Sequence, residues 1–331
     1  MRAAIYAGKG GPISIETLPD PEPGPGDVLV RVHRCGICGT DLSMTKGDVW
    51  DYGAGQFGHE YAGEIVAVGR DVEGLRVGDR ISVLPSLSCG TCSAAHGNHV
   101  LCRHAGGATF GFAELARIPA EVAVRLPSTL SMSDGALVEP MAISLYGVRQ
   151  SRICAGDRVL VLGGGTVALY AIYWARQLGA GRIVAMSRSE RRRDLALAMG
   201  ADSFIRYGDG EVGEVTEALG GAPDIVYECV GTEGMLGKTL QHVGLLGRIV
   251  SLGFCTRPDP IMPAIASYKC ATMQFLVGYT MRDFLHVADR MDKGHADPKA
   301  IISNDIPLAD LPAMVDRLRG PNDETKVHVL L

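Results

Sequence analysis

The chain has 331 residues, of which 47% are hydrophobic and only 6% aromatic, and its formal net charge at pH 7 is −5. This length accommodates two domains, and the charge gives no electrostatic reason to expect a nucleic acid or an anionic membrane as a partner. No apolar run approaches the length of a membrane span, and the first residues lack the apolar core of a secretory signal. Nine cysteines, an odd number, fit a reducing compartment better than a disulfide scaffold, so we expect a cytoplasmic protein.

The first 140 residues are predicted to be rich in β-strands. Short runs of β-branched residues bounded by glycine and proline predict strands at 28–33, 64–68 and 80–84. The proline-rich stretch 19–26 offers few backbone donors and predicts an extended loop.

After about residue 140 the pattern changes to strands that alternate with helices. The predicted strands are 159–162, 182–186, 224–228 and 248–252, with helices at 167–178 and 190–199. Continuous apolar strands separated by helices imply a parallel sheet covered on both faces. Beyond residue 277, a helix at 282–293 and a closing strand at 326–331 are expected to return to the first domain.

Two short loops carry residue types that bind metals. Cys38 lies in the segment CGICGTD and His59 in the segment GHE. A thiolate and an imidazole flanked by carboxylates are what an open zinc site needs. Asp41 is placed to hold the other ring nitrogen of His59, and Thr40 to put a hydroxyl beside a substrate oxygen on the metal. The alternatives are a redox pair for the Cys-x-x-Cys segment and an ordinary turn for Gly-His-Glu.

A glycine-rich loop, GGGTVA at 163–168, directly follows the predicted strand 159–162 and opens a helix. This is the context that the dinucleotide-binding fingerprint requires. Gly163 permits the tight turn, Gly165 lets a pyrophosphate approach the backbone, and Ala168 lets helix and strand pack closely. The candidate cofactor contacts in this loop are Gly163, Gly165, Thr166, Val167 and Ala168.

The end of the second strand indicates which dinucleotide is bound. An NAD site usually carries a carboxylate there, whereas this strand ends in Ser187 and Arg188. A hydroxyl followed by a guanidinium suits a 2′-phosphate, so we expect NADP, with NAD as the alternative. The competing interpretation is that Ser187 and Ser189 cap the next helix while Arg188 belongs to a solvated face.

Several motifs occur in a fixed order along nearly the whole chain. They are GHE-x-x-G at 58–63, VGDR at 77–80, VEP at 138–140, the glycine loop and D-x-x-x-EC-x-G at 224–231. In this order the chain resembles the zinc-dependent medium-chain dehydrogenases, the alcohol and polyol dehydrogenase family. The resemblance implies an α/β protein in which a Rossmann domain, a doubly wound parallel sheet, is inserted into a β-rich GroES-like catalytic domain. The implied boundaries are 1–141 for the catalytic domain, 142–276 for the Rossmann domain and 277–331 for the return to the catalytic domain.

The resemblance also implies roles for residues of the first domain. It assigns the catalytic zinc to three ligands, Cys38, His59 and Glu139. Glu60 matches a carboxylate near the metal that can move onto it. Thr40 matches the hydroxyl that begins the proton relay, and Ser43 stands where some family members carry the relay histidine.

Cofactor contacts and assembly follow from the same resemblance. Tyr207 matches a tyrosine that packs near the 2′-phosphate in NADP-preferring members. Leu252 and Gly253 are expected to border the nicotinamide, and Lys326 to approach the pyrophosphate. The family also implies a homodimer or homotetramer.

A second, structural zinc site is only partly represented. Cys89, Cys92 and Cys102 match three of the family's four cysteines, but Ala95 stands where the remaining one belongs. A closed zinc site needs four ligands, so either a nearby histidine substitutes or the loop binds no metal.

The sequence therefore predicts a zinc-dependent oxidoreductase that transfers a hydride between NADP(H) and a small secondary alcohol, diol or polyol. Trp50 and Tyr52 are candidates for the substrate pocket. The alternatives are a zinc-free enone or quinone reductase of the same superfamily and a nucleotide-binding sensor without turnover. The presence of Cys38, His59 and Glu139 argues against the zinc-free reductase.

Overall fold

The computed structural model describes residues 1–47, 54–87, 89, 98–102, 106–295 and 297–331. Trp50, Tyr52 and Cys92 of the sequence-based predictions lie outside these residues. The chain divides into two compact units, the first made of Met1–Ala142 and Gly278–Leu331 and the second of Ile143–Val277.

The main sheet of the first unit brings both ends of the chain together. Its strand order is β10-β6-β5-β3-β18-β17, and β9 pairs with β3. The bounds are β3 Asp27–Gly36, β5 Glu60–Val68, β6 Arg80–Val83, β9 Leu115–Pro119, β10 Ala123–Arg125, β17 Ile302–Pro307 and β18 Lys326–Leu330. β18 pairs antiparallel with β3, so the C-terminal segment joins the sheet that the N-terminal segment builds.

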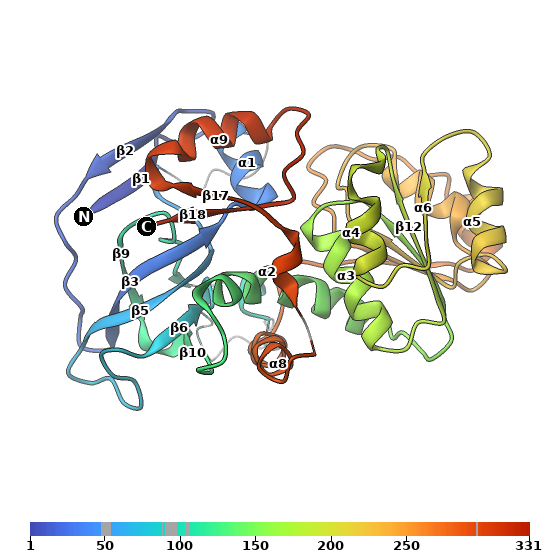
Figure 1. Ribbon diagram of the computed structural model, residues 1–331. Helices are drawn as coiled ribbons and strands as arrows, with labels where there is room; N and C mark the ends of the chain where they lie inside the picture. Colours follow the sequence, from blue (N-terminus) through green and yellow to red (C-terminus); the bar gives the residue numbers. More distant parts are fainter. Residues whose placement is uncertain (48–53, 88, 90–97, 103–105, 296) are drawn as a thin grey trace. The chain divides into compact units, whose positions relative to one another are not determined.

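Smaller elements of the first unit surround this sheet (Figure 1). A second sheet has the order β2-β1-β4, and β7 pairs with β8. The remaining strands are β1 Arg2–Tyr6, β2 Ile13–Thr17, β4 Gly55–Gln56, β7 Ser86–Leu87 and β8 Gly106–Gly107. The helices are α1 Gly39–Lys46, α2 Met132–Gln150, which continues into the second unit, α8 Met281–Asp292 and α9 Leu311–Leu318, with 3₁₀ turns η2 His99–Leu101, η3 Ala120–Val122, η5 Pro298–Ile301 and η6 Leu308–Asp310.

Alternation of side chains explains why β3 forms the middle of the first unit. Val28, Val30 and Val32 point to one face of the strand and are fully buried, while Arg31 between them is exposed. This period of two is what a half-buried strand requires. The prediction of a strand at 28–33 is confirmed, and the strand continues to Gly36, next to the loop that carries Cys38.

The second unit is a six-stranded parallel sheet in the order β13-β12-β11-β14-β15-β16. The strands are β11 Arg158–Leu162, β12 Arg182–Ser187, β13 Ser203–Arg206, β14 Ile225–Glu228, β15 Arg248–Ser251 and β16 Thr272–Phe275. Figure 1 shows α3 and α4 on one face and α5 and α6 on the other. The helices are α3 Thr166–Gln177, α4 Arg193–Ala198, α5 Glu211–Leu219, α6 Met235–His242 and α7 Pro263–Lys269.

The strand order of the second unit reverses between β11 and β14, and in such sheets ligands bind outside the carboxyl ends of the strands at this reversal. The four predicted strands are confirmed within one residue at each end. The predicted helix 190–199 is instead a 3₁₀ turn, η4 Glu190–Arg192, followed by the short α4, because its first turn is wound more tightly than an α-helix.

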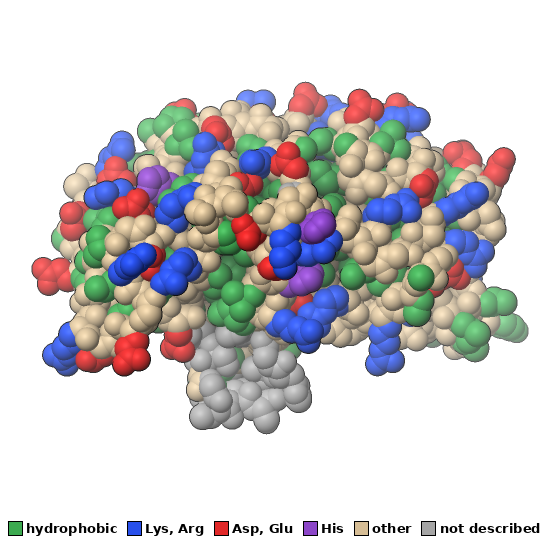
Figure 2. Space-filling model, turned by 60° about the horizontal axis from the view of Figure 1, so that its bottom comes forward, with side chains coloured by type: hydrophobic (Ala, Val, Ile, Leu, Met, Phe, Trp, Pro, Cys, Tyr) green, Lys and Arg blue, Asp and Glu red, His purple; other side chains and the backbone are tan. Residues whose placement is uncertain are grey.

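None of the helices among the described residues is long and apolar enough to cross a membrane. Figure 2 shows Lys and Arg side chains interspersed with Asp and Glu over the described part of the face in view. This mixture agrees with the modest net charge of the chain.

Candidate metal and dinucleotide sites

Cys38 is fixed at the start of α1 by the residues that follow it. Its sulfur accepts the backbone N–H of Thr40 at 3.5 Å, and its own N–H donates to Asp41 Oδ2 at 2.9 Å. The backbone N–H of Asp41 also faces the Cys38 side chain, so Cys38 and Asp41 form a capping box in which each side chain accepts the other residue's backbone N–H. The local sequence therefore sets the position of the Cys38 sulfur.

Asp41 also orients His59, as the sequence predicts. Its Oδ1 lies 3.4 Å from Nδ1 of His59, and the carboxylate is buried. Nε2 is then the ring nitrogen that could bind a metal. Burial disfavours a charged imidazole, but Asp41 and Cys38 outweigh that penalty and raise the pKa of His59 well above its usual value. Surroundings that favour a proton on this ring also favour a metal cation beside it.

Three ligand atoms converge at this point. The sulfur of Cys38, a ring nitrogen of His59 and a carboxylate oxygen of Glu60 all lie within 4.8 Å of one another. Sulfur, imidazole nitrogen and carboxylate oxygen are the donor types that zinc takes in proteins. The residues present therefore fit a zinc ion.

Glu60 is held by a buried lysine. Lys326 Nζ donates to Glu60 Oε2 at 2.5 Å and to the carbonyl of Ile37 at 3.0 Å. A Cβ on Gly36 would lie 2.2 Å from Glu60 Oε2, so glycine makes room for the carboxylate. Lys326 is predicted to approach the cofactor's pyrophosphate, and in this structure its ammonium donates to Glu60. The reason is that a buried carboxylate requires a cationic partner, and β18 supplies one.

Glu139 lies on α2 with its carboxylate buried. Burial, reinforced by Glu60 and opposed by His59, raises the pKa of Glu139 to about 7. The buried hydroxyl of Tyr279 lies near it and has no hydrogen-bond partner of normal geometry among the described residues. Glu139 is thus a neighbour of the Cys38–His59 pair, while Glu60 is the carboxylate inside the 4.8 Å set.

The other predicted residues of the first unit have varied surroundings. Thr40 and Ser43 are half-buried on α1, and Cys35 is fully buried, as expected of a cysteine that is not a ligand. The backbone N–H of Cys89 donates to the sulfur of Cys102 at 3.3 Å, so these two predicted ligands of a structural zinc are neighbours.

The glycine loop of the second unit has the backbone that the fingerprint predicts. Gly163 has φ +124°, which favours glycine, and a Cβ there would lie 3.4 Å from Cβ of Ala168. Gly165 is the N-cap of α3 and makes no side-chain capping bond, and a Cβ on it would meet nothing within 4 Å. The open space over Gly165 at the start of a helix fits a phosphate.

Ser187, Arg188 and Tyr207 lie at the ends of two neighbouring strands. A Cβ on Gly164 would lie 3.4 Å from Ser187 Oγ, so this hydroxyl faces the glycine loop, while Arg188 is exposed. The N–H of Tyr207 donates to the carbonyl of Ser187 at 3.0 Å. The Tyr207 hydroxyl is buried without a partner among the described residues, and Lys238 Nζ lies 4.8 Å from the centre of its ring. An unpartnered buried hydroxyl beside an exposed arginine fits an anionic ligand.

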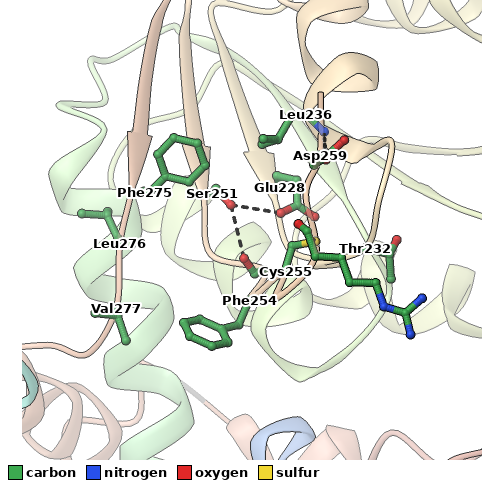
Figure 3. Close-up of a pocket in the computed structure, with 12 residues that line it drawn as sticks. Glu228, Thr232, Leu236, Ser251, Phe254, Cys255, Asp259, Phe275, Leu276 and Val277 are labelled. Carbon is green, nitrogen blue, oxygen red and sulfur yellow. Dashed lines mark hydrogen bonds between the residues drawn. The ribbon is translucent and has the colours of Figure 1, made fainter. Parts of the chain in front are cut away.

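A cavity of about 370 Å³ opens at the carboxyl ends of β14, β15 and β16 (Figure 3). Gly253 lines it, together with Thr232, Phe254 and Val277. The side chain of Leu252 packs against Gly147 of α2, where a Cβ would lie 2.5 Å from it. Of the two residues expected to border the nicotinamide, Gly253 therefore lines the cavity, and Leu252 contributes to helix packing.

Known families match both units. Residues 24–128 match the alcohol dehydrogenase GroES-like domain, and residues 166–293 match the zinc-binding dehydrogenases. The chain is 32% identical over 315 residues to the (R,R)-butanediol dehydrogenase of Bacillus subtilis (strain 168), with 90% of each chain covered. The chain belongs to the zinc-dependent medium-chain dehydrogenase/reductase family. The predicted fold class, with GroES-like and Rossmann domains, is confirmed, as is the prediction of an oxidoreductase.

Other members of this family are similar over most of their length. The L-threonine 3-dehydrogenase of Streptomyces avermitilis is 32% identical over 299 residues, with 86% of each chain covered. A zinc-binding dehydrogenase from Sinorhizobium meliloti 1021, solved with NADP bound, is 31% identical with a TM-score of 0.90. The comparison covers 100% of this chain and 99% of that one.

Sequence reasoning missed three members of these sites, Tyr279 beside Glu139, Lys238 beside Tyr207, and Ser251 beside Glu228. None of them lies in a motif, and each reaches its partner only through the tertiary fold. A buried polar atom that needs a partner is the signal that identifies them, and it exists only in the structure.

Proposed function

We propose that this dehydrogenase oxidises a small secondary alcohol, diol or polyol, or reduces the corresponding ketone, at a zinc centre with NADP(H) as the hydride carrier. The observation that carries the proposal is the convergence of Cys38, His59 and Glu60 within 4.8 Å beside Thr40. The family relatives named above support the substrate class, because butanediol and the C3 position of threonine both present a secondary hydroxyl.

The zinc ligands in this proposal are Cys38, His59 and Glu139. The raised pKa of Glu139 supports its part, because a divalent cation near this buried carboxylate would remove the cost of its charge. Glu60, tied to Lys326, stays beside the metal as a further carboxylate. When bound, zinc supplies Lewis-acid polarisation of the substrate oxygen, and the nicotinamide supplies or accepts the hydride.

We propose that Thr40 moves the proton of the substrate hydroxyl. Its backbone is fixed by the bond to Cys38, and its side chain is half-buried at the first turn of α1. Ser43 follows three residues later and therefore lies on the same face of the helix. We propose that the proton passes from the substrate oxygen to the Thr40 hydroxyl and on towards solvent past Ser43.

The preference for NADP rests on Ser187, Arg188 and Tyr207. An NADP 2′-phosphate would gain charge-assisted bonds from Arg188, and hydroxyl bonds from Ser187 and Tyr207. Hydrogen bonds to charged groups contribute about 1.5–3 kcal/mol, which corresponds to roughly a 10- to 100-fold preference for NADP(H). The glycine loop contributes equally to either dinucleotide, with Gly163, Gly165, Thr166, Val167 and Ala168 forming the turn and the first turn of α3.

We also propose that the chain forms a homodimer or homotetramer in the cytoplasm. β16 is the edge strand of its sheet and carries an exposed Phe275, and Tyr268 on the preceding α7 is 88% exposed. An exposed apolar edge of this kind is suited to pairing with a second copy. The eight cysteines that the structure describes are all free thiols, which supports a reducing compartment.

The proposal is tested by turnover of a panel of alcohols and ketones with zinc-loaded protein, followed by absorbance of the reduced nicotinamide. Secondary alcohols with NADP should give the highest kcat/KM. His59→Ala should lose turnover yet bind NADPH as the parent does, because the nucleotide site lies in the other unit. A His59→Ala variant that keeps full activity would contradict the proposed zinc chemistry.

A further inference from the structure

Glu228, the last residue of β14, is a buried carboxylate that the proposed reaction does not use. Its Oε1 accepts the backbone N–H groups of Val230 at 2.6 Å and Gly231 at 2.8 Å. Its Oε2 accepts the hydroxyl of Ser251, the last residue of β15, at 3.1 Å (Figure 3). One carboxylate therefore ties the end of β15 to the loop that follows β14.

Two glycines let these loops touch backbone to backbone. Gly231 has φ +69°, and a Cβ on it would lie 2.5 Å from the backbone nitrogen of Phe254. A Cβ on Gly253 would lie 2.2 Å from the nitrogen of Gly231 and 2.5 Å from Glu228 Oε2. The motif at 224–231 thus encodes a tight joint between two loops, with Glu228 inside it.

A second carboxylate joins the same two loops, this time from the loop that follows β15. Asp259, in the loop after β15, accepts the backbone N–H of Gly234 at 2.8 Å and that of Leu236 at 2.9 Å. Gly234 and Leu236 lie at the start of α6, so Asp259 holds the far end of the β14–α6 loop. Glu228 and Asp259 together fix this loop at both of its ends.

The fixed loops form a wall of the 370 Å³ cavity. Thr232 and Leu236 line it from the β14–α6 loop and the start of α6, and Gly253, Phe254 and Asp259 line it from the β15–α7 loop. The cavity lies at the carboxyl ends of the strands, where doubly wound sheets bind their ligands. Any movement of the joint would change the shape of this wall.

We propose that Glu228 and Asp259 are positioning residues for the dinucleotide, which hold the β14–α6 and β15–α7 loops in the shape that binds it. The inference rests on the proposed function of the second unit. Replacing Glu228 by glutamine removes the negative charge that strengthens the bonds from Val230 and Gly231. It also puts an amide N–H₂ group where the Ser251 hydroxyl now donates, so that bond must reverse or break and the joint loosens. Asp259→Asn has the same effect with a smaller cost, because Asp259 is only half-buried.

Asp224, which directly precedes the same strand, provides a matched control. It bonds to the Arg158 side chain at 2.9 and 3.0 Å and to the Arg158 N–H at 2.9 Å. Glu228 is four residues further along than Asp224, which at about 3.3 Å per residue places the two about 13 Å apart along the strand. Asp224→Asn should therefore reduce the melting temperature of the unit without changing its affinity for dinucleotide.

The test is NADPH fluorescence titration together with thermal melting of full-length, zinc-loaded protein. We expect the Kd for NADPH to rise at least tenfold in Glu228→Gln and about threefold in Asp259→Asn, and less than twofold in Asp224→Asn. Ser251→Ala breaks the same bond between the two loops. The Kd for NADPH of the double variant Glu228→Gln/Ser251→Ala should therefore be no more than twofold higher than that of Glu228→Gln alone.

The inference is overturned if the Kd of Glu228→Gln for NADPH is within twofold of the parent's. It is also overturned if the rise in Kd of every variant simply follows the decrease in its melting temperature. Additive losses in the Ser251 double variant would also overturn it. If the parent binds NADH instead of NADPH, the cofactor proposal is wrong, and the same comparison made with NADH still decides the role of Glu228. Binding of neither dinucleotide by the parent would refute both.

Discussion

His328 is the histidine that we expect to make the first unit acid-sensitive. It lies on β18 with its side chain fully buried, and neither ring nitrogen has a hydrogen-bond partner among the described residues. Burial, reinforced by the nearby charges of Lys326 and Arg34 and opposed by Asp305, lowers the pKa of His328 to about 3. The folded protein therefore holds this imidazole neutral at all pH values well above 3.

The size of the effect follows from the difference in pKa between the two states. In the unfolded chain a histidine titrates near pH ~6.5, so the unfolded state takes up the proton first as the pH falls. The free energy of unfolding contributed by neutral His328 is therefore complete above pH ~6.5 and is lost as the pH falls from there towards the folded pKa. At pH 5 the loss amounts to about 2 kcal/mol.

Urea unfolding at pH 8 and pH 5 measures this loss. Between these pH values the free energy of unfolding should fall by about 2 kcal/mol more in the parent than in His328→Leu, which has no group to protonate. Val329→Ala, a buried neighbour on the same strand, serves as the control, because it should be less stable than the parent by the same amount at both pH values. Equal pH dependence of the parent and His328→Leu would refute the reasoning.

Three further substitutions test the two sites. Thr40→Val should retain zinc and NADPH binding and lose at least 100-fold in kcat, because only proton transfer is removed, and an unchanged kcat would exclude the relay. Arg188→Ala should reduce the ratio of kcat/KM with NADP to that with NAD by roughly 10- to 100-fold, and an unchanged ratio would place this side chain in solvent. Lys326→Met should reduce the free energy of unfolding by about 3–5 kcal/mol, because it leaves Glu60 buried without its cationic partner, and a variant as stable as the parent would show that the pair is not needed.

Local sequence patterns predicted those elements whose conformation depends on residues close to them in the sequence. The glycine loop at 163–168 is decided by neighbours within a few positions, and it has the predicted form. The strands of the second unit could also be predicted locally. A strand that is buried on both faces appears in the sequence as a short, uninterrupted run of apolar residues.

Contacts between distant segments could not be predicted in this way. Lys326 is 266 positions from Glu60, and no local feature of β18 indicates which buried carboxylate it neutralises. The tie between Glu228 and Ser251 depends on the register of two adjacent strands, which is a property of the folded sheet. In both cases a buried polar group must be paired. Which groups are buried, and which partners lie within reach, is known only once the fold is known.

The central claim is a zinc ion held by Cys38, and zinc content per chain tests it most directly. Elemental analysis of protein purified with zinc should find zinc bound to the parent and to Cys35→Ala, whose buried sulfur is not one of the three ligand atoms that converge. Cys38→Ala should lose one zinc per chain relative to both, and its NADPH binding should be unchanged. Equal zinc content in Cys38→Ala and Cys35→Ala would contradict the account.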